Sequence, residues 1–220
     1  MFGDSFLQYY HNTWCESLVE GMGWESINHS GFPGGSQHTI YEAFVEFAKH
    51  KDTDIVLFCH TEPMRLPNKS KLGITPSSVW KDDPNGIIFP WKDDPKNVDV
   101  INAARNYYSY ICYERFHTDT FNLMIKEIQN ICYDKRWKQI HLQSFPKNAP
   151  KIHGFWLDTD LFNIGDKVLP HGWMWDKNLK NHFSTELHTK LTKWLIPHIS
   201  WYLDKDIDHH IVRLYPEELA

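Results

Sequence analysis

A hydroxyl nucleophile is suggested by the first six residues of the chain, Met-Phe-Gly-Asp-Ser-Phe. Ser5 follows a short apolar stretch and precedes an amphipathic one, so the sequence predicts it where a strand gives way to a helix. A serine there can attack a carbonyl carbon if a base removes its proton and amides stabilise the oxyanion. The alternative is ordinary turn chemistry, in which Asp4 and Ser5 bond to nearby amides and Ser5 caps the helix.

Three later segments offer partners for Ser5. They contribute the candidate base His182, the loop amides of Gly34 and Gly35, and the polar pair Thr61 and Glu62. His182 stands just before a predicted helix, and the polar pair follows an apolar strand, so all would meet at the carboxyl edge of a parallel sheet. The alternatives are a helix-flanking histidine that bonds the backbone and a simple tight turn at the two glycines.

The elements that must position these residues alternate between strand and helix. We expect strands before Ser5 and at residues 24–28, 54–59 and 138–145, and helices at residues 6–22, around 40–47, at 100–132 as one or two helices, and from 184 onward. The run 54–59 is continuously apolar, as a parallel strand covered on both faces requires. The order predicts one domain over residues 1–220, a three-layer α/β/α sandwich with a mostly parallel, flavodoxin-like sheet.

Three segments do not follow this alternation. Residues 66–98 are rich in Pro, Lys and Asp, contain Trp-Lys-Asp-Asp-Pro twice, and predict a surface insertion. Residues 147–181 have no clear period and many turn residues, which predicts loops. Asp208-His209-His210 could suggest a metal, but adjacent histidines diverge in a strand, so we expect a solvated tail.

Composition narrows the function classes. The net charge of -5 and the lack of a basic stripe argue against a nucleic-acid binder. The chain shows no secretory signal and no membrane-length apolar run, so we expect a soluble cytoplasmic protein that does not bind membranes. The four cysteines lack CxxC spacing and are expected as thiols rather than as disulfides or zinc ligands; they are Cys15, Cys59, Cys112 and Cys132.

Together the motifs resemble the SGNH (GDSL-type) hydrolase superfamily. The likeness rests on Gly-Asp-Ser-Phe at the start, a glycine loop after the second strand, a polar residue after the third, and a histidine before the last helix. Gly34-Gly35-Ser36, the segment 61–65 and Asn181-His182-Phe183-Ser184 look like a divergent branch found in large marine bacteriophages. Such a protein would act in a host cytoplasm or in a virion assembly.

The resemblance implies roles for particular residues. Ser5 would be the nucleophile, His182 the base, and Gly35 or Gly34 the second oxyanion donor beside the Ser5 amide. Substrate contacts would come from Gly34, Thr61, Glu62 and Arg65, with Arg65 alternatively in a structural ion pair. No metal or organic cofactor is implied.

The chain departs from the family pattern at two of these positions. Glu62 stands where the family has an asparagine, and an ionised carboxylate repels an oxyanion. Leu179 and Lys180 stand where the family usually has an aspartate, and Asp176 is the nearest acid. A Ser-His dyad or a displaced acid is therefore required.

Two functions from different classes follow. The first is a serine esterase that cleaves a small-molecule or glycan ester, such as a carbohydrate O-acyl group or a lipid ester. The second is a catalytically degenerate phage structural or glycan-binding protein, in which loop tryptophans could stack on sugars; these are Trp80, Trp91, Trp173 and Trp175. Tryptophans that cover the core are the simpler interpretation of that set.

Overall fold

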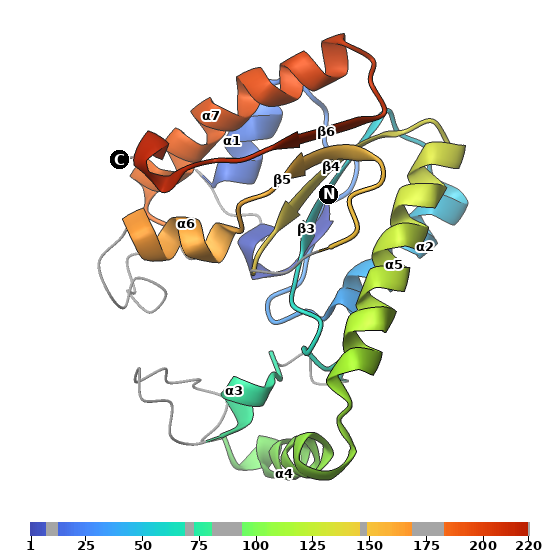
Figure 1. The fold of residues 1–220 in the computed structure, drawn as a ribbon, viewed down its shortest axis with the longest axis vertical. Helices are drawn as coiled ribbons and strands as arrows, with labels where there is room; N and C mark the ends of the chain where they lie inside the picture. Colours follow the sequence, from blue (N-terminus) through green and yellow to red (C-terminus); the bar gives the residue numbers. More distant parts are fainter. Residues whose placement is uncertain (8–12, 69–72, 81–93, 146–148, 169–182, 220) are drawn as a thin grey trace.

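The chain forms a parallel sheet flanked by helices on both faces (Figure 1). This computed structural model describes residues 1–7, 13–68, 73–80, 94–145, 149–168 and 183–219. The sheet has six strands in the order β2-β1-β3-β4-β5-β6, and every neighbouring pair is parallel. The strands are β1 Phe2–Gly3, β2 Ser30–Gly31, β3 Ile55–His60, β4 Lys138–Gln143, β5 Gly154–Leu157 and β6 His209–Val212. This confirms the α/β class and the flavodoxin-like order of the first five strands.

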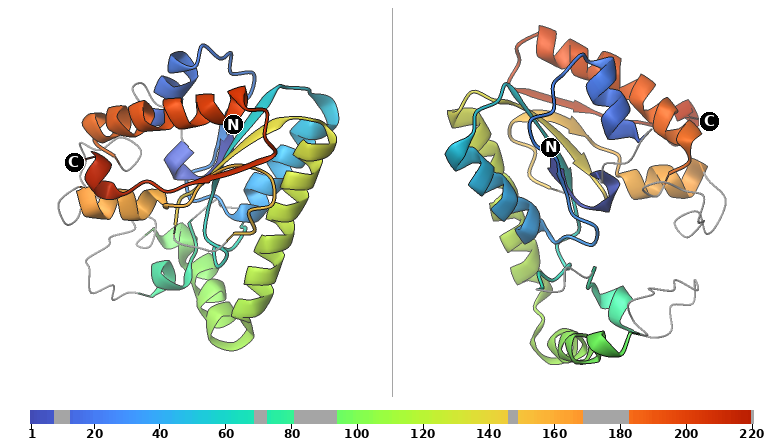
Figure 2. Two further views of the ribbon diagram at one scale, coloured as in Figure 1. Left: turned by 45° about the horizontal axis from the view of Figure 1, so that its top comes forward. Right: turned by 180° about the vertical axis from the view of Figure 1, so that it is seen from behind.

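Helices cover the sheet in two layers, which Figure 2 shows from two further directions. Helices α1 and α7 pack together on one face, and α2 and α5 pack together on the other. The α-helices are α1 Trp14–Gly21, α2 Gln37–His50, α3 Pro76–Val79, α4 Val98–Asn106, α5 Glu114–Asp134, α6 Leu161–Val168 and α7 Thr185–Asp204. Shorter turns are η1 Ser5–Leu7, η3 Pro95–Asn97, η6 Pro216–Leu219 and the π-helix η4 Tyr107–Ile111.

Alternation along β3 divides the core between the two layers. Leu57 and Cys59 face the α1 and α7 side, whereas Val56 and Phe58 face the α2 and α5 side. Because both faces of a central parallel strand are covered, the strand reads as one apolar run, as the sequence predicts for this segment. The buried strand ends at His60, which brings the residues that follow to the carboxyl edge of the sheet.

Serine side chains cap the starts of two helices, and the sequence predicts the helix start at Ser184. Ser36 Oγ accepts the Thr39 N–H at 3.2 Å and begins α2, and Ser184 Oγ accepts the Leu187 N–H at 3.2 Å and begins α7. The helical stretch predicted at 100–132, as one helix or two, is observed as two helices, α4 and α5, separated by η4. Cys15, Cys59 and Cys132 are buried free thiols, as expected, and Cys112 is a half-buried one.

Three predictions about the sheet are wrong. Residues 24–28 do not form a strand; β2 lies at Ser30–Gly31, where the chain pairs with Phe2–Gly3. The loop-rich stretch after 147 contains β5 and α6, and the expected solvated tail at His209 is strand β6. β5 and β6 are only four residues long, and β6 lies at an edge of the sheet, where polar side chains are tolerated.

The described residues 66–68, 73–80 and 94–108 form a small satellite at the carboxyl edge. Ile74, Val79 and Ala104 are its buried core, and Tyr108 Oη ties it to the body by donating to the Met64 carbonyl at 2.6 Å. Figure 1 shows α3 and α4 at the lower end of the molecule, away from the sheet. Within the described ranges, none of the helices combines the length and apolar character needed to cross a membrane.

Candidate functional site

The candidate nucleophile lies at the point where the strand order of the sheet reverses. The chain runs from β1 to β2 on one side of it, and then crosses over β1 to form β3 and the later strands on the other side. Ligands of open α/β sheets bind at this switch point, outside the carboxyl ends of the strands. Ser5 directly follows Gly3 and Asp4 at that end of β1, and it is half-buried in η1.

The turn that carries Ser5 is tightly packed. The Phe6 N–H donates to Asp4 Oδ1 at 3.0 Å, and the Leu7 N–H donates to the Asp4 carbonyl at 3.1 Å. Gly3 is required because a Cβ there would lie 2.8 Å from Cys59 Cβ and 2.9 Å from Leu7 Cβ. The turn and β3 therefore approach each other more closely than any other residue at position 3 permits.

The glycine loop after β2 reaches the same edge. Gly34 has a φ of 69°, and the Gly35 N–H donates to the Phe32 carbonyl at 2.7 Å. The Gly35 amide is thus used inside its own turn. Beside this loop lies a cavity of about 440 Å³, and none of the described residues that line it, 31–36, Thr39 and 66–68, has an ionisable side chain.

Residues that follow β3 form a charged cluster with Asp4. Arg65 Nη1 lies 3.6 Å from Asp4 Oδ2, and Arg65 Nη2 donates to Glu62 Oε1 at 3.4 Å. Arg65 also donates to the Gly35 carbonyl at 3.3 Å, and Thr61 is buried between the cluster and the end of β3. Burial raises the pKa of Asp4, and the nearby guanidinium of Arg65 opposes that rise.

Ser144 completes this cluster and was not anticipated from the sequence. It directly follows β4, its side chain is fully buried, and its Oγ donates to Asp4 Oδ1 at 2.7 Å. Cys59 Sγ lies 3.2 Å from the same hydroxyl oxygen. The available signal was a serine at the end of the predicted strand 138–145, on the edge where Ser5 was expected.

A second aspartate at this edge also escaped the sequence analysis. Asp160 lies between β5 and α6, is 8% exposed, and accepts the Asn163 N–H on Oδ1 and the Asn163 side-chain amide on Oδ2, both at 2.8 Å. These bonds hold the start of α6. The signal was an aspartate directly before the apolar pair Leu161 and Phe162, since aspartate is a favoured residue at the start of a helix.

His60, the last residue of β3, takes part in a buried chain of hydrogen bonds. Gln37 Nε2 donates to His60 Nδ1 at 3.1 Å, and the His60 ring shares a 2.9 Å bond between its Nε2 and His141 Nδ1. His141 Nε2 in turn lies 2.9 Å from Gln139 Oε1. Burial lowers the pKa of His60 to about 3 and also lowers that of His141, so both rings are neutral at pH 7. With both nitrogens engaged, His60 is not a base for Ser5.

The predicted base His182 and the acid Asp176 lie outside the described residues, as do Trp91, Trp173 and Trp175. The described chain resumes at Phe183, which is fully buried. Its ring packs edge-on against Phe6 with centroids 5.6 Å apart. Residues next to Ser5 and next to His182 in the sequence are therefore in contact although 177 positions separate them.

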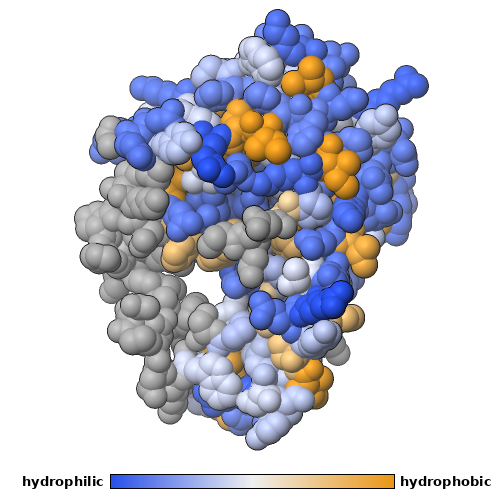
Figure 3. Space-filling model, in the orientation of Figure 1, coloured by the Kyte–Doolittle hydropathy of each residue, from blue (hydrophilic) through white to orange (hydrophobic). Residues whose placement is uncertain are grey.

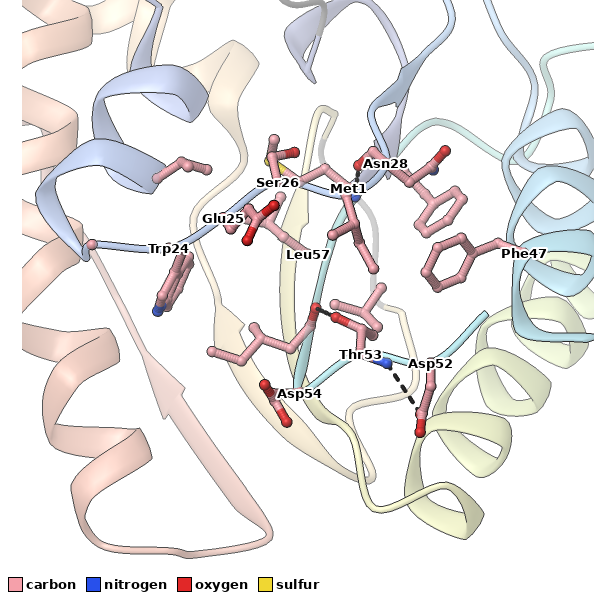
Figure 4. Close-up of a pocket in the computed structure, with 16 residues that line it drawn as sticks. Met1, Trp24, Glu25, Ser26, Asn28, Phe47, Asp52, Thr53, Asp54 and Leu57 are labelled. Atoms are coloured by element: carbon pink, nitrogen blue, oxygen red, sulfur yellow. Dashed lines mark hydrogen bonds between the residues drawn. The ribbon is translucent and has the colours of Figure 1, made fainter. Parts of the chain in front are cut away.

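A second cavity of about 440 Å³ opens at the opposite, amino-terminal edge of the sheet (Figure 4). Its apolar walls include Trp24, Phe47 and Leu57, and its rim carries Asp52 and Asp54. Asp52 accepts the Thr53 N–H at 3.1 Å and the Trp137 indole N–H at 2.6 Å. Ser5 and the loops described above do not line this cavity.

The described residues include no candidate metal centre. No group of three or more His, Cys, Asp or Glu side chains within it is arranged to hold a metal ion. The face shown in Figure 3 is mostly hydrophilic, with apolar residues in small separate groups. Comparison of the chain with protein-family models, with curated proteins and with solved structures found no match.

Proposed function

We propose that the chain is a serine ester hydrolase resembling the SGNH superfamily, with Ser5 as nucleophile and His182 as base. The observation that carries the proposal is the packing of Phe6 on Phe183 at 5.6 Å, because it joins the residues adjacent to the two proposed catalytic groups. The position of Ser5 at the switch point of the sheet adds support from the fold.

The reaction proposed is acyl transfer to Ser5 followed by hydrolysis. Ser5 Oγ forms a bond to the ester carbon while its proton passes to His182, and the alcohol leaves with that proton. Water then attacks the acyl carbon while His182 accepts its proton, the bond between the acyl carbon and Ser5 Oγ breaks, and His182 returns the proton to Ser5 Oγ as the acid leaves. The Ser5 amide is one oxyanion donor; since the Gly35 N–H is already donated to Phe32, Gly34 is the better candidate for the second.

The cavity beside the glycine loop supports an uncharged ester as substrate. The described part of its lining combines Phe32, Leu66 and two prolines with the polar side chains of Ser36, Thr39 and Asn68, and none of these side chains carries a charge. Arg65, which could hold a substrate anion, is paired with Asp4 and Glu62. A neutral acyl group, on a sugar or a lipid alcohol, suits this environment better than an anionic one.

The test is labelling with a fluorophosphonate probe, which reacts with activated serines. We expect one label per chain, its loss in Ser5→Ala, and retention in the matched variant Ser26→Ala at the exposed amino edge. Release of p-nitrophenol from a short acyl ester should follow the same pattern. Folded protein that takes no label, or a Ser5→Ala variant that labels as before, would remove the proposal.

The second candidate function is a binding protein on the same scaffold that has lost catalysis. It is favoured by the Gly35 N–H, which is donated within its own loop, and by Glu62, whose carboxylate is paired with Arg65. It predicts no labelling of wild-type protein together with saturable binding to immobilised glycans. Loss of that binding in Trp80→Ala, at a 45% exposed side chain, would support it.

A further inference from the structure

The turn that carries Ser5 is held by a single residue, Asp4, through its carboxylate and its main-chain carbonyl. Asp4 has no exposed surface, and its Oδ1 and its carbonyl oxygen accept the N–H groups of Phe6 and Leu7, the two residues that follow Ser5. Both bonds close the turn around Ser5. The direction in which the Ser5 hydroxyl points therefore depends on where Asp4 is held.

Ser144 binds the Asp4 carboxylate, and hydrogen bonds at the end of the sheet fix the position of the Ser144 backbone. Its Oγ donates to Asp4 Oδ1 at 2.7 Å, while its own N–H donates to the His60 carbonyl at 2.7 Å and its carbonyl accepts the Phe162 N–H at 2.9 Å. Its backbone is thus bonded on both sides, and its side chain is fully buried. Because the Ser144 backbone is fixed, its hydroxyl is a fixed hydrogen-bond donor that can hold the Asp4 carboxylate in one position.

Arg65 supplies the opposite charge and links the turn to the glycine loop. Its guanidinium lies 3.6 Å from Asp4 Oδ2, donates to the Gly35 carbonyl at 3.3 Å, and stacks over the Phe145 ring at 5.1 Å from the centroid. Arg65 is 8% exposed, so these contacts form away from bulk water. One side chain therefore sets the spacing between the Ser5 turn and the glycine loop.

We propose that Ser144 and Arg65 are positioning residues of the Ser5 site, acting through Asp4 to hold the nucleophile turn and the glycine loop in register. The inference rests on the proposed esterase function for its catalytic consequence. Its structural part, the tie from Ser144 through Asp4 to the Phe6 amide, stands independently of that function. Neither residue contacts the reacting atoms in this role.

The experiment compares Ser144→Ala with Ser144→Thr, which keeps the hydroxyl. In Ser144→Ala we expect the rate of fluorophosphonate labelling to fall about 10- to 100-fold, as small misplacements of a nucleophile do, with KM for a short ester within about twofold of wild type. Exchange of the Phe6 amide hydrogen should become at least about tenfold faster because its acceptor is no longer held. Ser144→Thr should restore both.

The matched control is Ser78→Ala, which removes another fully buried hydroxyl with two hydrogen bonds, to the Thr75 amide and carbonyl in the satellite. It should change neither readout. Folded Ser144→Ala that labels at the wild-type rate overturns the proposal. If wild-type protein takes no label, the esterase function fails instead, and the Phe6 exchange alone decides: unchanged exchange in Ser144→Ala overturns the positioning role.

Arg65→Lys decides the matter if Ser144→Ala does not fold. Lysine keeps the positive charge, but it has no planar fork that places one nitrogen beside Asp4 and the Gly35 carbonyl while the other nitrogen donates to Glu62. We expect labelling about tenfold slower than wild type in this variant. Wild-type labelling in Arg65→Lys would overturn the proposed link between the turn and the glycine loop.

Discussion

Each edge of the sheet carries a cavity of about 440 Å³, but the polar groups around these two cavities are very different. At the amino edge, Glu25, Asp52 and Asp54 are exposed, so water solvates their charges. At the carboxyl edge, Asp4 and Arg65 are buried, which costs desolvation that their ion pair and their hydrogen bonds to neighbouring groups offset. The buried charges of Asp4 and Arg65, which cost desolvation free energy, and not the size of the cavity, distinguish the edge where we expect chemistry.

The largest effect that this contrast predicts is the loss of the buried guanidinium. Arg65→Met leaves Asp4 as an uncompensated buried charge, which typically lowers the free energy of unfolding by about 3–5 kcal/mol. Asp4→Asn in the same chain should recover most of that loss, because it removes the charge as well. Urea unfolding at pH 7 of the single and double variants measures both effects.

The control is the exposed pair of Arg213 with Asp158, where Nη2 lies 2.6 Å from Oδ2. Arg213→Met should leave the urea midpoint unchanged within error, because water screens an exposed pair. Equal losses in Arg65→Met and Arg213→Met would mean that burial of the carboxyl-edge pair has no special cost, and the contrast between the edges would be lost.

The next effect is a loss of stability in acid that comes from the buried histidine pair behind this edge. Burial lowers the pKa of His60 to about 3, so between pH 6.5 and about 3 the unfolded chain binds a proton there that the folded chain does not. Stability therefore falls as pH falls through this window, by about 2 kcal/mol between pH 7 and pH 5 for each neutral ring. His141, also lowered by burial, acts in the same direction.

Urea unfolding from pH 7 to pH 4 checks this dependence. His60→Gln removes one of the two rings and should reduce the slope of stability against pH by about half. Exposed His50, paired with Glu46 on α2, provides the control: His50→Gln should leave the slope close to wild type. A slope that is the same in His60→Gln as in wild type would show that the buried pair is not its source.

Much of this carboxyl edge could be predicted from sequence because its segments carry strong local signals. These signals depend only on residues that are close together in the sequence. They are the apolar run of β3, the serines that begin α2 and α7, and the Gly34-Gly35 turn. Ser144 could not be found that way, since its partner Asp4 is 140 positions away and either residue alone is ordinary. The histidine pair also needs register, because His60 faces His141 only through the pairing of β3 with β4.

The sheet's short strands were missed for a related reason. β2 has two residues and no room for alternation, so the aromatic stretch before it looked more like a strand than Ser30–Gly31 did. β6 contains His209 and His210, and its place comes from pairing with β5 rather than from hydrophobicity. Pairing with neighbouring strands, and not the amino-acid composition of the segment itself, determines where such short strands form.

Two glycines, one at each edge, give a smaller and more local comparison. Gly3→Ala brings a Cβ within 2.9 Å of two neighbouring side chains and within 3.0 Å of the Cys59 carbonyl, an overpacking expected to cost about 2–3 kcal/mol. Gly23→Ala, beside the amino-edge cavity, has nothing within 4 Å and meets only the strain of its φ of 66°, about 1 kcal/mol. Thermal unfolding of the two variants should rank them in this order.

Labelling adds a second readout to the same pair. Gly3→Ala should also slow the reaction of Ser5 with a fluorophosphonate, because the turn must shift to admit the methyl group. Gly23→Ala should not. If Gly23→Ala were the more damaging variant in both assays, the tight approach of β1 to β3 would not be what holds the site.

The smallest effect is expected where the amino-edge cavity is filled. Ser26 is exposed and lines that cavity, so Ser26→Trp places an indole in it without disturbing the core. The length of the strands separates this cavity from Ser5, and none of the residues bonded to Asp4 lines it. Labelling of Ser5 should therefore stay within about twofold of wild type. Thr39→Trp, in the lining of the cavity beside the glycine loop, is the opposite case and should block ester hydrolysis. A tenfold loss in Ser26→Trp with Thr39→Trp unaffected would assign the substrate to the amino edge and reverse the comparison.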